Sequence, residues 1–313
     1  MKVLLTGGNG LVGKAIRRVA TELQLDWELE APSRSELDLG SQTAVADWFA
    51  KHRYDAVIHA AARVGGIKAN MTYPTAFLAE NALINTFVIE AARSQGIASL
   101  LFIGSSCMYP KDLDKELEET DILTAPLEPT NEGYALAKIL GARHCSAISS
   151  EFGLNYRTVI PCNLYGPDDH FDLDKGHLVA SALRKVATAR DEALSSVEIW
   201  GDGTARREFM FVDDLARFVI DWFPRLADLP QMINVGVGHD HSVNDYYRIA
   251  AEVVGFTGSF THDTTRPAGM RRKLMDVRIS NSLGWQATTP LSEGMRKAYL
   301  GMLRQDTQAL RKV

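Results

Sequence analysis

Several features that would assign the chain to other protein classes are missing from its sequence. Its 313 residues contain only three cysteines, Cys107, Cys145 and Cys162, which are far apart and odd in number. They form no Cys-x-x-Cys pair and no disulfide framework. The eight histidines are scattered, with no His-x-x-x-His pair. We therefore expect no metal site.

Long apolar runs and an excess of positive charge are also missing. No stretch reaches the roughly 18 unbroken apolar residues that a membrane-spanning helix requires, and Gly7 comes too early for a signal peptide. We therefore expect a cytoplasmic protein without a membrane partner. The formal net charge of −5 argues against nucleic acid as a partner, although it leaves room for a local basic pocket.

The first half of the sequence alternates short β-rich apolar runs with longer helical patterns. Strands are predicted at residues 2–6, 27–31, 56–59, 100–103 and 157–160, and helices at 11–23, 44–51, 73–95 and 134–151. This spacing predicts an α/β fold with a doubly wound parallel (Rossmann) sheet. The rhythm changes near residue 165. We therefore expect a dinucleotide-binding domain of residues 1–165 plus about 209–235, and a smaller substrate-binding lobe of 166–208 plus 236–313.

A glycine-rich turn lies between the first predicted strand and the first predicted helix. It comprises Gly7, Gly8, Asn9, Gly10, Leu11, Val12 and Gly13. Missing side chains let the backbone approach a pyrophosphate, which then lies at the positive end of the helix. A tight turn without a ligand is the alternative, but the position between strand and helix favours a dinucleotide.

The end of the second predicted strand bears on the choice of nicotinamide cofactor. Arg34, with Ser33, could bind a 2′-phosphate, which favours NADP. Glu30 could instead bind the ribose hydroxyls of NAD. Asp38 is placed to meet the adenine amino group or to cap a helix.

Tyr134 and Lys138 lie four residues apart, on one face of a predicted helix. A nearby ammonium favours the phenolate, so we expect Lys138 to lower the pKa of Tyr134. An exposed helix pair is the alternative for these two residues alone. Ser105 follows the fourth predicted strand, at the edge where parallel sheets bind ligands, and would reach the carbonyl that Tyr134 protonates.

In order and spacing, these elements resemble the extended short-chain dehydrogenase/reductase family. Dehydratases of that family carry two carboxyl groups after the serine, where this chain has Cys107 and Met108. The wider pattern is similar to the epimerase-reductases of GDP-4-keto-6-deoxymannose. The resembling segments are 60–67, 104–110, 127–132, 163–167, 176–177, 200–201, 207–209 and 272–273.

The resemblance implies NADPH-dependent 3,5-epimerisation and 4-reduction of a GDP-linked keto sugar to GDP-L-fucose. Cys107 would act as base, His177 as acid, and Tyr134 as proton donor to the reduced ketone. Without the resemblance, Cys107 would be a buried apolar residue and His177 a surface residue at a helix start. The alternatives are a GDP-colitose type synthase, a sugar-nucleotide 4-epimerase and a non-catalytic dinucleotide sensor.

The resemblance also implies further binding residues and a homodimer formed through helices 73–95 and 134–151. The further cofactor positions are Ile103, Gly104, Ser105, Ser106, Lys138, Pro161, Cys162, Asn163, Leu164 and His177. The positions for the GDP-sugar substrate are Lys185, Trp200, Arg207, Lys273 and Asp276. Asn9 and Cys162 depart from the family pattern, and Lys185 stands where some relatives have arginine.

Overall fold

A six-stranded parallel sheet forms the centre of the protein, seen here in a computed structural model that describes residues 1–172, 176–265 and 270–310. The strand order is β10-β5-β4-β3-β1-β2. The strands are β1 (Lys2–Thr6), β2 (Glu28–Glu30), β3 (Ala56–His59), β4 (Ser99–Ile103), β5 (Asn155–Pro161) and β10 (Met232–Val235). The order reverses between β1 and β3, and such a point in an open sheet is where ligands bind.

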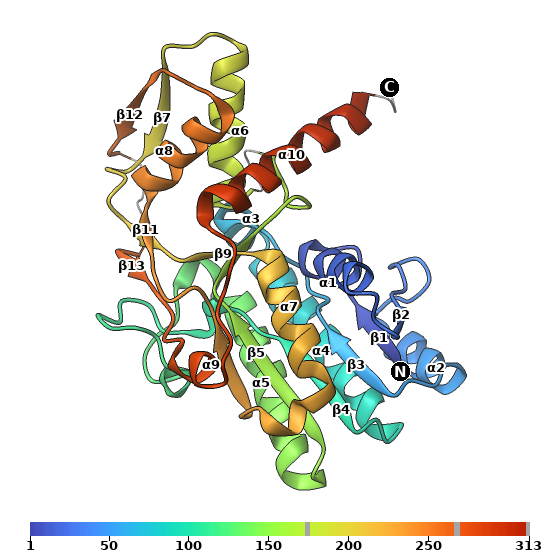
Figure 1. Ribbon diagram of the computed structural model, residues 1–313. Helices are drawn as coiled ribbons and strands as arrows, with labels where there is room; N and C mark the ends of the chain where they lie inside the picture. Colours follow the sequence, from blue (N-terminus) through green and yellow to red (C-terminus); the bar gives the residue numbers. More distant parts are fainter. Residues whose placement is uncertain (173–175, 266–269, 311–313) are drawn as a thin grey trace.

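Helices cover both faces of this sheet (Figure 1), which confirms the predicted doubly wound fold. One face carries α1 (Leu11–Glu22) and α7 (Val212–Trp222). The other carries α2 (Gln42–Lys51), α4 (Pro74–Ser94) and α5 (Glu132–Phe152). Because both faces are covered, the strands consist of continuous apolar runs, as in β4, where four of the five residues are buried.

A smaller lobe lies beyond the carboxyl ends of the strands (Figure 1). Its helices are α6 (Leu178–Asp191), α8 (Val243–Val254) and α10 (Leu291–Leu310), and β7 (Ser196–Trp200) pairs with β12 (Ser259–Asp263). The remaining elements are α3 (Ile67–Thr72), α9 (Arg278–Ser282), β6 (Asn163–Tyr165), β8 (Arg206–Arg207), β9 (Phe209–Phe211), β11 (His241–Ser242), β13 (Arg272–Lys273) and the short helices η1 (Ser106–Met108), η2 (Glu119–Asp121), η3 (Pro129–Asn131) and η4 (Phe223–Asp228).

Two separate apolar cores stabilise the sheet and the lobe, and β9 contributes to both. Met210 packs into the core of the sheet, whereas Phe209 and Phe211 pack into the core of the lobe. This alternation follows from the two-residue period of a strand. Met275 and Trp285, assigned from the sequence to the lobe, pack into the core of the sheet. The expected division into two domains remains a prediction.

One buried carboxylate links the sheet to the lobe. Glu208 accepts hydrogen bonds from the backbone N–H groups of Val237 at 2.6 Å and Gly238 at 2.8 Å, in the loop after β10. Its second oxygen accepts one from Met275 at 2.8 Å, two residues beyond β13. Burial raises the pKa of Glu208 to about 7, although the three N–H groups oppose that rise.

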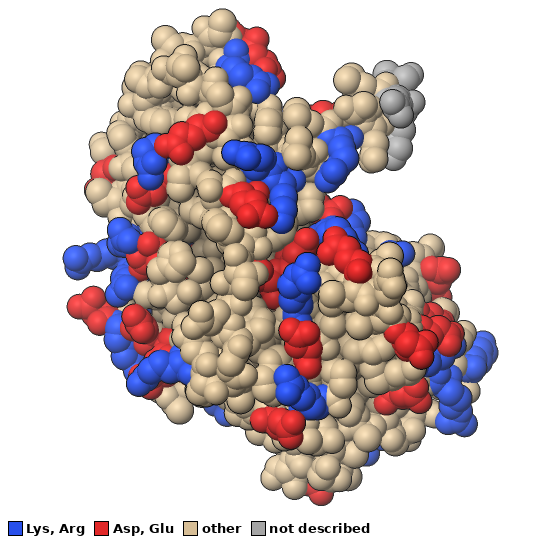
Figure 2. All heavy atoms as spheres, viewed as in Figure 1, with Lys and Arg blue, Asp and Glu red and all other residues tan. Residues whose placement is uncertain are grey.

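The surface in view in Figure 2 carries positive and negative side chains intermixed over both the sheet and the lobe. None of the helices within residues 1–172, 176–265 and 270–310 combines the length and the apolar character that crossing a membrane requires.

Candidate active site

The glycine-rich turn has the geometry of a phosphate cradle at the end of β1. Gly7 has a φ of +73°, and a Cβ there would lie 2.7 Å from the backbone of Ala60. A side chain at Gly13 would collide with the carbonyl oxygen of Gly7, so this glycine lets helix and strand approach. At Gly10 the nearest protein atom to a Cβ is 3.4 Å away. The absence of a side chain at Gly10 therefore leaves the N-terminus of α1 accessible to a ligand, and no side chain caps this helix.

The residues after β2 favour a phosphate over a free ribose hydroxyl. Glu30, the candidate for NAD, forms an ion pair with Lys2 at 3.0 Å. Arg34 is exposed, and within the described residues its guanidinium has no hydrogen bond or ion pair. Asp38 is exposed and accepts a hydrogen bond from the N–H of Gly40 at 3.0 Å, so it closes a local turn.

The structure brings Ser105, Tyr134 and Lys138 together where β4 ends and α5 begins. The Ser105 side chain lies near the Tyr134 hydroxyl and lowers its pKa slightly. The Lys138 ammonium is buried, donates to the carbonyl oxygen of Ile103 at 2.7 Å and lies 5.9 Å from the centre of the Tyr134 ring. Of the two predicted interpretations of Tyr134 and Lys138, the exposed helix pair is excluded by this burial.

The effect of Lys138 on Tyr134 differs from the expected one. Burial raises the pKa of Tyr134, with a further rise from the charge of Cys107 and a smaller opposing effect of Ser105. Burial also lowers the pKa of Lys138 to about 7. Desolvation is therefore the largest influence on the pKa of both groups. Tyr134 consequently remains a phenol at neutral pH, which is the form that can donate a proton.

Cys107 belongs to the same cluster. It lies in η1, and its backbone N–H donates to the Oγ of Ser105 at 3.2 Å. Its sulfur accepts a hydrogen bond from the side-chain amide of Asn131 at 3.3 Å. Its charge affects the pKa of both Tyr134 and Lys138. The thiol is half-buried, so it is neither a core residue nor freely exposed.

His177 immediately precedes α6, at the N-cap position of that helix. Its ring has an accessible face, but the surrounding protein desolvates it and lowers its pKa. Within the described residues, the ring makes no hydrogen bond with Cys107 or Tyr134. Its acid role remains a prediction.

The other expected cofactor positions lie at the carboxyl ends of β4 and β5. Gly104 packs tightly, since a Cβ there would lie 3.2 Å from Thr158. Cys162 is buried, which raises the pKa of its thiol. The amide of Asn163 donates to the carbonyl oxygen of Glu208 at 2.9 Å. Ile103, Ser106 and Pro161 are buried, and Leu164 is half-buried.

Arg207 and Lys273 lie opposite each other on β8 and β13, which pair in parallel. Opposite residues of paired strands point to the same side, so both cations face one region. Their strand neighbours Arg206 and Arg272 hold the buried carboxylate of Asp240 between them, at 2.5 and 2.6 Å. The shared carboxylate fixes the register of β8 and β13, so that Arg207 and Lys273 stay opposite each other. Two cations in this arrangement could bind a diphosphate.

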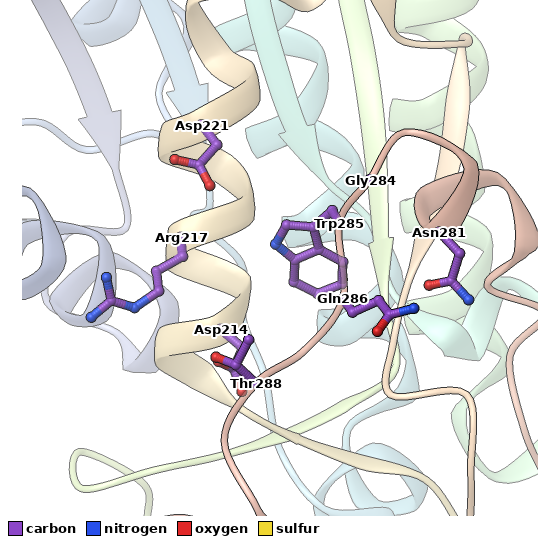
Figure 3. Close-up of a pocket in the computed structure, with 8 residues that line it drawn as sticks. All are labelled: Asp214, Arg217, Asp221, Asn281, Gly284, Trp285, Gln286 and Thr288. Atoms are coloured by element: carbon purple, nitrogen blue, oxygen red, sulfur yellow. The ribbon is translucent and has the colours of Figure 1, made fainter.

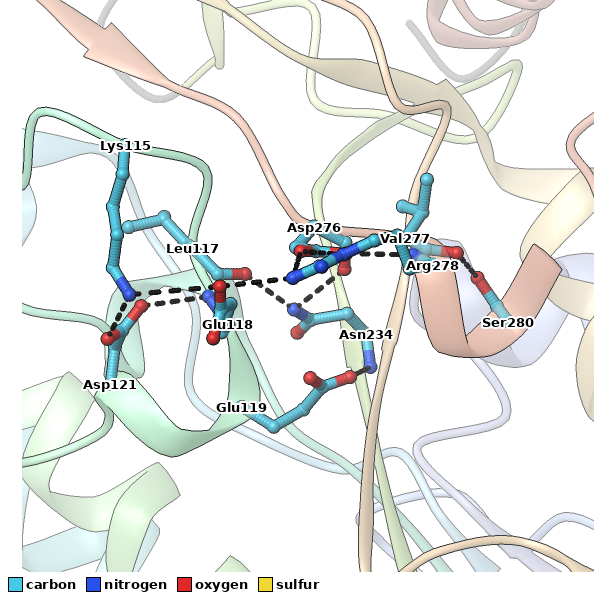
Figure 4. A network of polar contacts seen from close by, with 10 residues as sticks. All are labelled: Lys115, Leu117, Glu118, Glu119, Asp121, Asn234, Asp276, Val277, Arg278 and Ser280. Carbon is cyan, nitrogen blue, oxygen red and sulfur yellow. Dashed lines mark hydrogen bonds and ion pairs between the residues drawn. The ribbon is translucent and has the colours of Figure 1, made fainter. Parts of the chain in front are cut away.

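Lys185 and Trp200 form a second pair in the lobe, with the ammonium 5.4 Å from the centre of the indole ring. Asp276 is buried, and its carboxylate accepts hydrogen bonds from the N–H and Nε of Arg278 at 2.8 and 2.7 Å. Arg278 in turn contacts Glu118 at 3.1 Å, as Figure 4 shows. Asp276 therefore takes part in a polar network that holds the loop before η2.

A pocket between α7 and the segment that leads to α10 contains none of the predicted site residues (Figure 3). Asp214, at its edge, accepts hydrogen bonds from Thr288 and Thr289, which fastens that segment to α7. The remaining residues around it are Arg217, Asp221, Asn281, Gly284, Trp285 and Gln286.

A chain of buried hydrogen bonds connects the end of β1 with the backbone of α5. The N–H of Ala61 donates to the Oγ1 of Thr6 at 3.3 Å, and Thr6 pairs with the Nδ1 of His59 at 2.6 Å. The Nε2 of His59 pairs with the Oδ1 of Asn85 at 3.1 Å, and Asn85 donates to the carbonyl oxygen of Ala137 at 2.9 Å. The Oδ1 of Asn85 can only accept, so the Nε2 of His59 donates to it. The Nδ1 of His59 then accepts from the hydroxyl of Thr6, and His59 is neutral with its proton on Nε2.

This neutral histidine should make stability depend on pH. Burial, and then the charge of Lys138, lower the pKa of His59 to about 3 from 6.5. Below 6.5 the unfolded chain binds a proton that the folded chain does not, so stability falls with falling pH by about 1.4 kcal/mol per pH unit. We expect the stability of His59→Gln to lack this dependence on pH, because glutamine does not titrate. Urea unfolding between pH 7 and 5 should show the deficit of the variant shrinking; a constant deficit would contradict a neutral buried imidazole.

Comparison with known proteins identifies the family of the chain. Residues 3–236 match the NAD dependent epimerase/dehydratase family. The chain belongs to this family. The family expected from the sequence is thereby confirmed.

Similar proteins act on GDP-linked sugars. The chain is 45% identical to the GDP-L-colitose synthase of Yersinia pseudotuberculosis, over 95% of this chain and 96% of that protein. It is 43% identical to the GDP-L-fucose synthase of Azorhizobium caulinodans, over 95% of each. A GDP-mannoheptose C4 reductase from Campylobacter jejuni, solved with NADP bound, has a TM-score of 0.88 at 29% identity, covering 96% of this chain and 98% of that one.

Sequence reasoning missed three residues that shape the site: Asn131, His59 and Asn85. Asn131 lies inside a segment that carries the family resemblance, but no spacing rule connects it with Cys107. His59 ends a buried strand, where a polar residue is unusual, and that was the available signal.

Proposed function

We propose that this chain is an NADPH-dependent epimerase-reductase that converts GDP-4-keto-6-deoxymannose to GDP-L-fucose. The observation that carries the proposal is the position of Cys107, whose backbone N–H donates to the Oγ of Ser105 at 3.2 Å, in the same cluster as Tyr134 and Lys138. A simple ketone reductase needs only Ser105, Tyr134 and Lys138. A thiol beside them adds a group that can remove a proton next to the ketone.

In the proposed epimerisation, Cys107 takes the proton from sugar C3 and, after passing it to solvent while His177 regains a proton from solvent, takes the proton from C5. Both hydrogens are acidic because the C4 ketone stabilises the enolate. Ser105 and Tyr134 bind the C4 oxygen and stabilise the charge that develops there. His177, proposed as the acid on the opposite face, returns a proton and so inverts each centre.

In the proposed reduction, NADPH supplies a hydride to C4 when it is bound. The Oη of Tyr134 then gives its proton to the C4 oxygen, for which its raised pKa keeps it protonated. Lys138 orients the nicotinamide ribose, while the turn from Gly7 to Gly13 holds the pyrophosphate. Lys185, Arg207 and Lys273 bind the diphosphate of the GDP-sugar, and Trp200 and Asp276 line its nucleotide site.

Formation of GDP-colitose is a second candidate, since the chain is 45% identical to a GDP-L-colitose synthase. Colitose lacks the C3 hydroxyl of fucose, so the two activities differ in their keto substrate. The test incubates the protein with NADPH and either GDP-4-keto-6-deoxymannose or its 3-deoxy analogue, and identifies the product by NMR. We expect GDP-L-fucose from the first. Turnover of the 3-deoxy analogue alone would favour the second candidate, and cofactor binding without turnover would indicate a sensor.

Arg34 should determine the preference for NADPH. A charge-assisted contact with the 2′-phosphate stabilises binding enough that Arg34→Ala should raise the KM for NADPH about tenfold to a hundredfold. The KM for NADH should not change. Arg53→Ala, which removes an exposed arginine near Gln95, is the control. Steady-state kinetics with both cofactors measure the effect, and equal losses for both would contradict the role.

We also propose a homodimer formed through α4 and α5. These packed helices leave Leu78 and Leu83 on α4, and Leu136 and Leu140 on α5, between 38% and 46% exposed. Exposed leucines on two helices that pack against each other are consistent with an interaction surface. We expect a dimer in sedimentation velocity and a monomer for the double variant Leu83→Glu, Leu140→Glu. Leu303→Glu, which charges a similarly exposed site on α10, should remain dimeric; a monomeric wild type would refute this proposal.

The unpaired state of all three cysteines supports the proposed cytoplasmic location, because thiols persist in reducing compartments.

A further inference from the structure

Asn131 has an unusual orientation at the start of α5. It occupies the N-cap position, where an asparagine normally accepts a backbone N–H of the first turn through its Oδ1. Here its side chain makes no cap hydrogen bond. Its Oδ1 is buried and has no hydrogen-bond partner among the described residues. Neither helix stability nor the satisfaction of polar groups explains this orientation.

The amide nitrogen of Asn131 explains it. This nitrogen donates to the Sγ of Cys107 at 3.3 Å. A donor at sulfur stabilises the thiolate over the thiol, because the thiolate is the stronger acceptor. Among the described residues, the titratable groups whose pKa the charge of Cys107 affects are Tyr134 and Lys138.

We propose that Asn131 is a positioning residue that holds the Cys107 sulfur, through the hydrogen bond from its side-chain amide, in the place from which it acts as base. The proposal deepens the proposed function, in which Cys107 is the base for epimerisation. Asn131 acts through the sulfur, and Tyr134 and Lys138 perform the reduction without it. Replacing Asn131 should therefore slow the removal of protons from the sugar by Cys107, and leave ketone reduction and cofactor binding intact.

The first test follows the thiol without any turnover. The full-length protein is alkylated with iodoacetamide between pH 5 and 10, and peptide mass spectrometry isolates Cys107 from the buried Cys145 and Cys162. We expect Asn131→Ala to slow alkylation of Cys107 at neutral pH about tenfold. Asn131→Asp, of nearly equal size, should slow it further, because a negative charge then replaces the N–H donor beside the sulfur.

Thr130→Ala is the matched control. The Thr130 hydroxyl donates to Glu128 in the same turn at 3.1 Å, so its loss perturbs the segment without touching the sulfur. Its alkylation profile should equal that of the wild type. The thermal midpoint of Asn131→Ala should also stay at the wild-type value, because no cap hydrogen bond is lost.

The second test separates proton removal from reduction. In D₂O, Asn131→Ala should incorporate deuterium at C3 and C5 about tenfold more slowly, with an unchanged Kd for NADPH. Wild-type alkylation profiles in both Asn131 variants would overturn the proposal even if the chain makes GDP-L-fucose. Shifted profiles in a chain that turns over neither keto sugar would support the contact and refute the proposed function instead.

Discussion

Tyr134→Phe should lower the rate of ketone reduction by about two to four orders of magnitude, the usual contribution of a positioned general acid. The substitution removes one oxygen and keeps the ring, which packs edge-on against Phe77 with ring centres 6.5 Å apart. It also leaves Lys138 bound to the carbonyl oxygen of Ile103. The loss should therefore appear in kcat, with the Kd for NADPH unchanged.

Oxidation of NADPH, followed at 340 nm with the keto sugar present, measures this effect. Tyr73→Phe removes the hydroxyl of an exposed tyrosine and should retain full activity. Hydride transfer at the wild-type rate in Tyr134→Phe would refute the assignment of Tyr134 as proton donor. Deuterium exchange at C3 and C5 should be less affected, because Ser105 still binds the C4 oxygen.

Cys107→Ser should lower proton exchange at C3 and C5 by a similar factor of about 10² to 10⁴. A hydroxyl has nearly the shape of a thiol but is a far weaker acid, so little of the basic form exists at neutral pH. The backbone N–H of residue 107 still binds Ser105, and therefore NADPH binding should remain.

NMR of the keto sugar in D₂O without NADPH measures this exchange directly. Cys145→Ala is the control, because Cys145 is buried on α5 and carries no proposed role. Wild-type exchange in Cys107→Ser would transfer the base role to another residue. Loss of both exchange and NADPH binding would instead indicate a collapsed site.

The sheet was predictable because burial on both faces leaves its strands apolar throughout. β1 and β3 begin and end at the predicted residues. The helix predicted from residue 44 begins earlier, at Gln42, because Ser41 caps it through the N–H of Ala44. In the lobe, β8 and β13 consist of two residues each, and their pairing depends on the carboxylate of Asp240, 32 residues from Arg272. No local pattern encodes such a pairing.

The candidate site likewise combines features that the sequence predicts with features that it does not. Ser105, Tyr134 and Lys138 come together because a strand end and a helix start are local features that the sequence encodes. The pKa of Tyr134 could not be predicted, since it depends on burial by elements distant in the chain. The contact of Asn131 with Cys107 depends on how η1 meets α5, which is set by tertiary packing.

The anchoring of three backbone N–H groups on Glu208 has a mechanical consequence. Any separation at this point would leave those groups without their shared acceptor, and for the buried N–H of Met275 no water would replace it. Because Glu208 directly follows Arg207 on β8, these three hydrogen bonds tie the strand that carries Arg207 both to the loop after β10 and to the segment after β13.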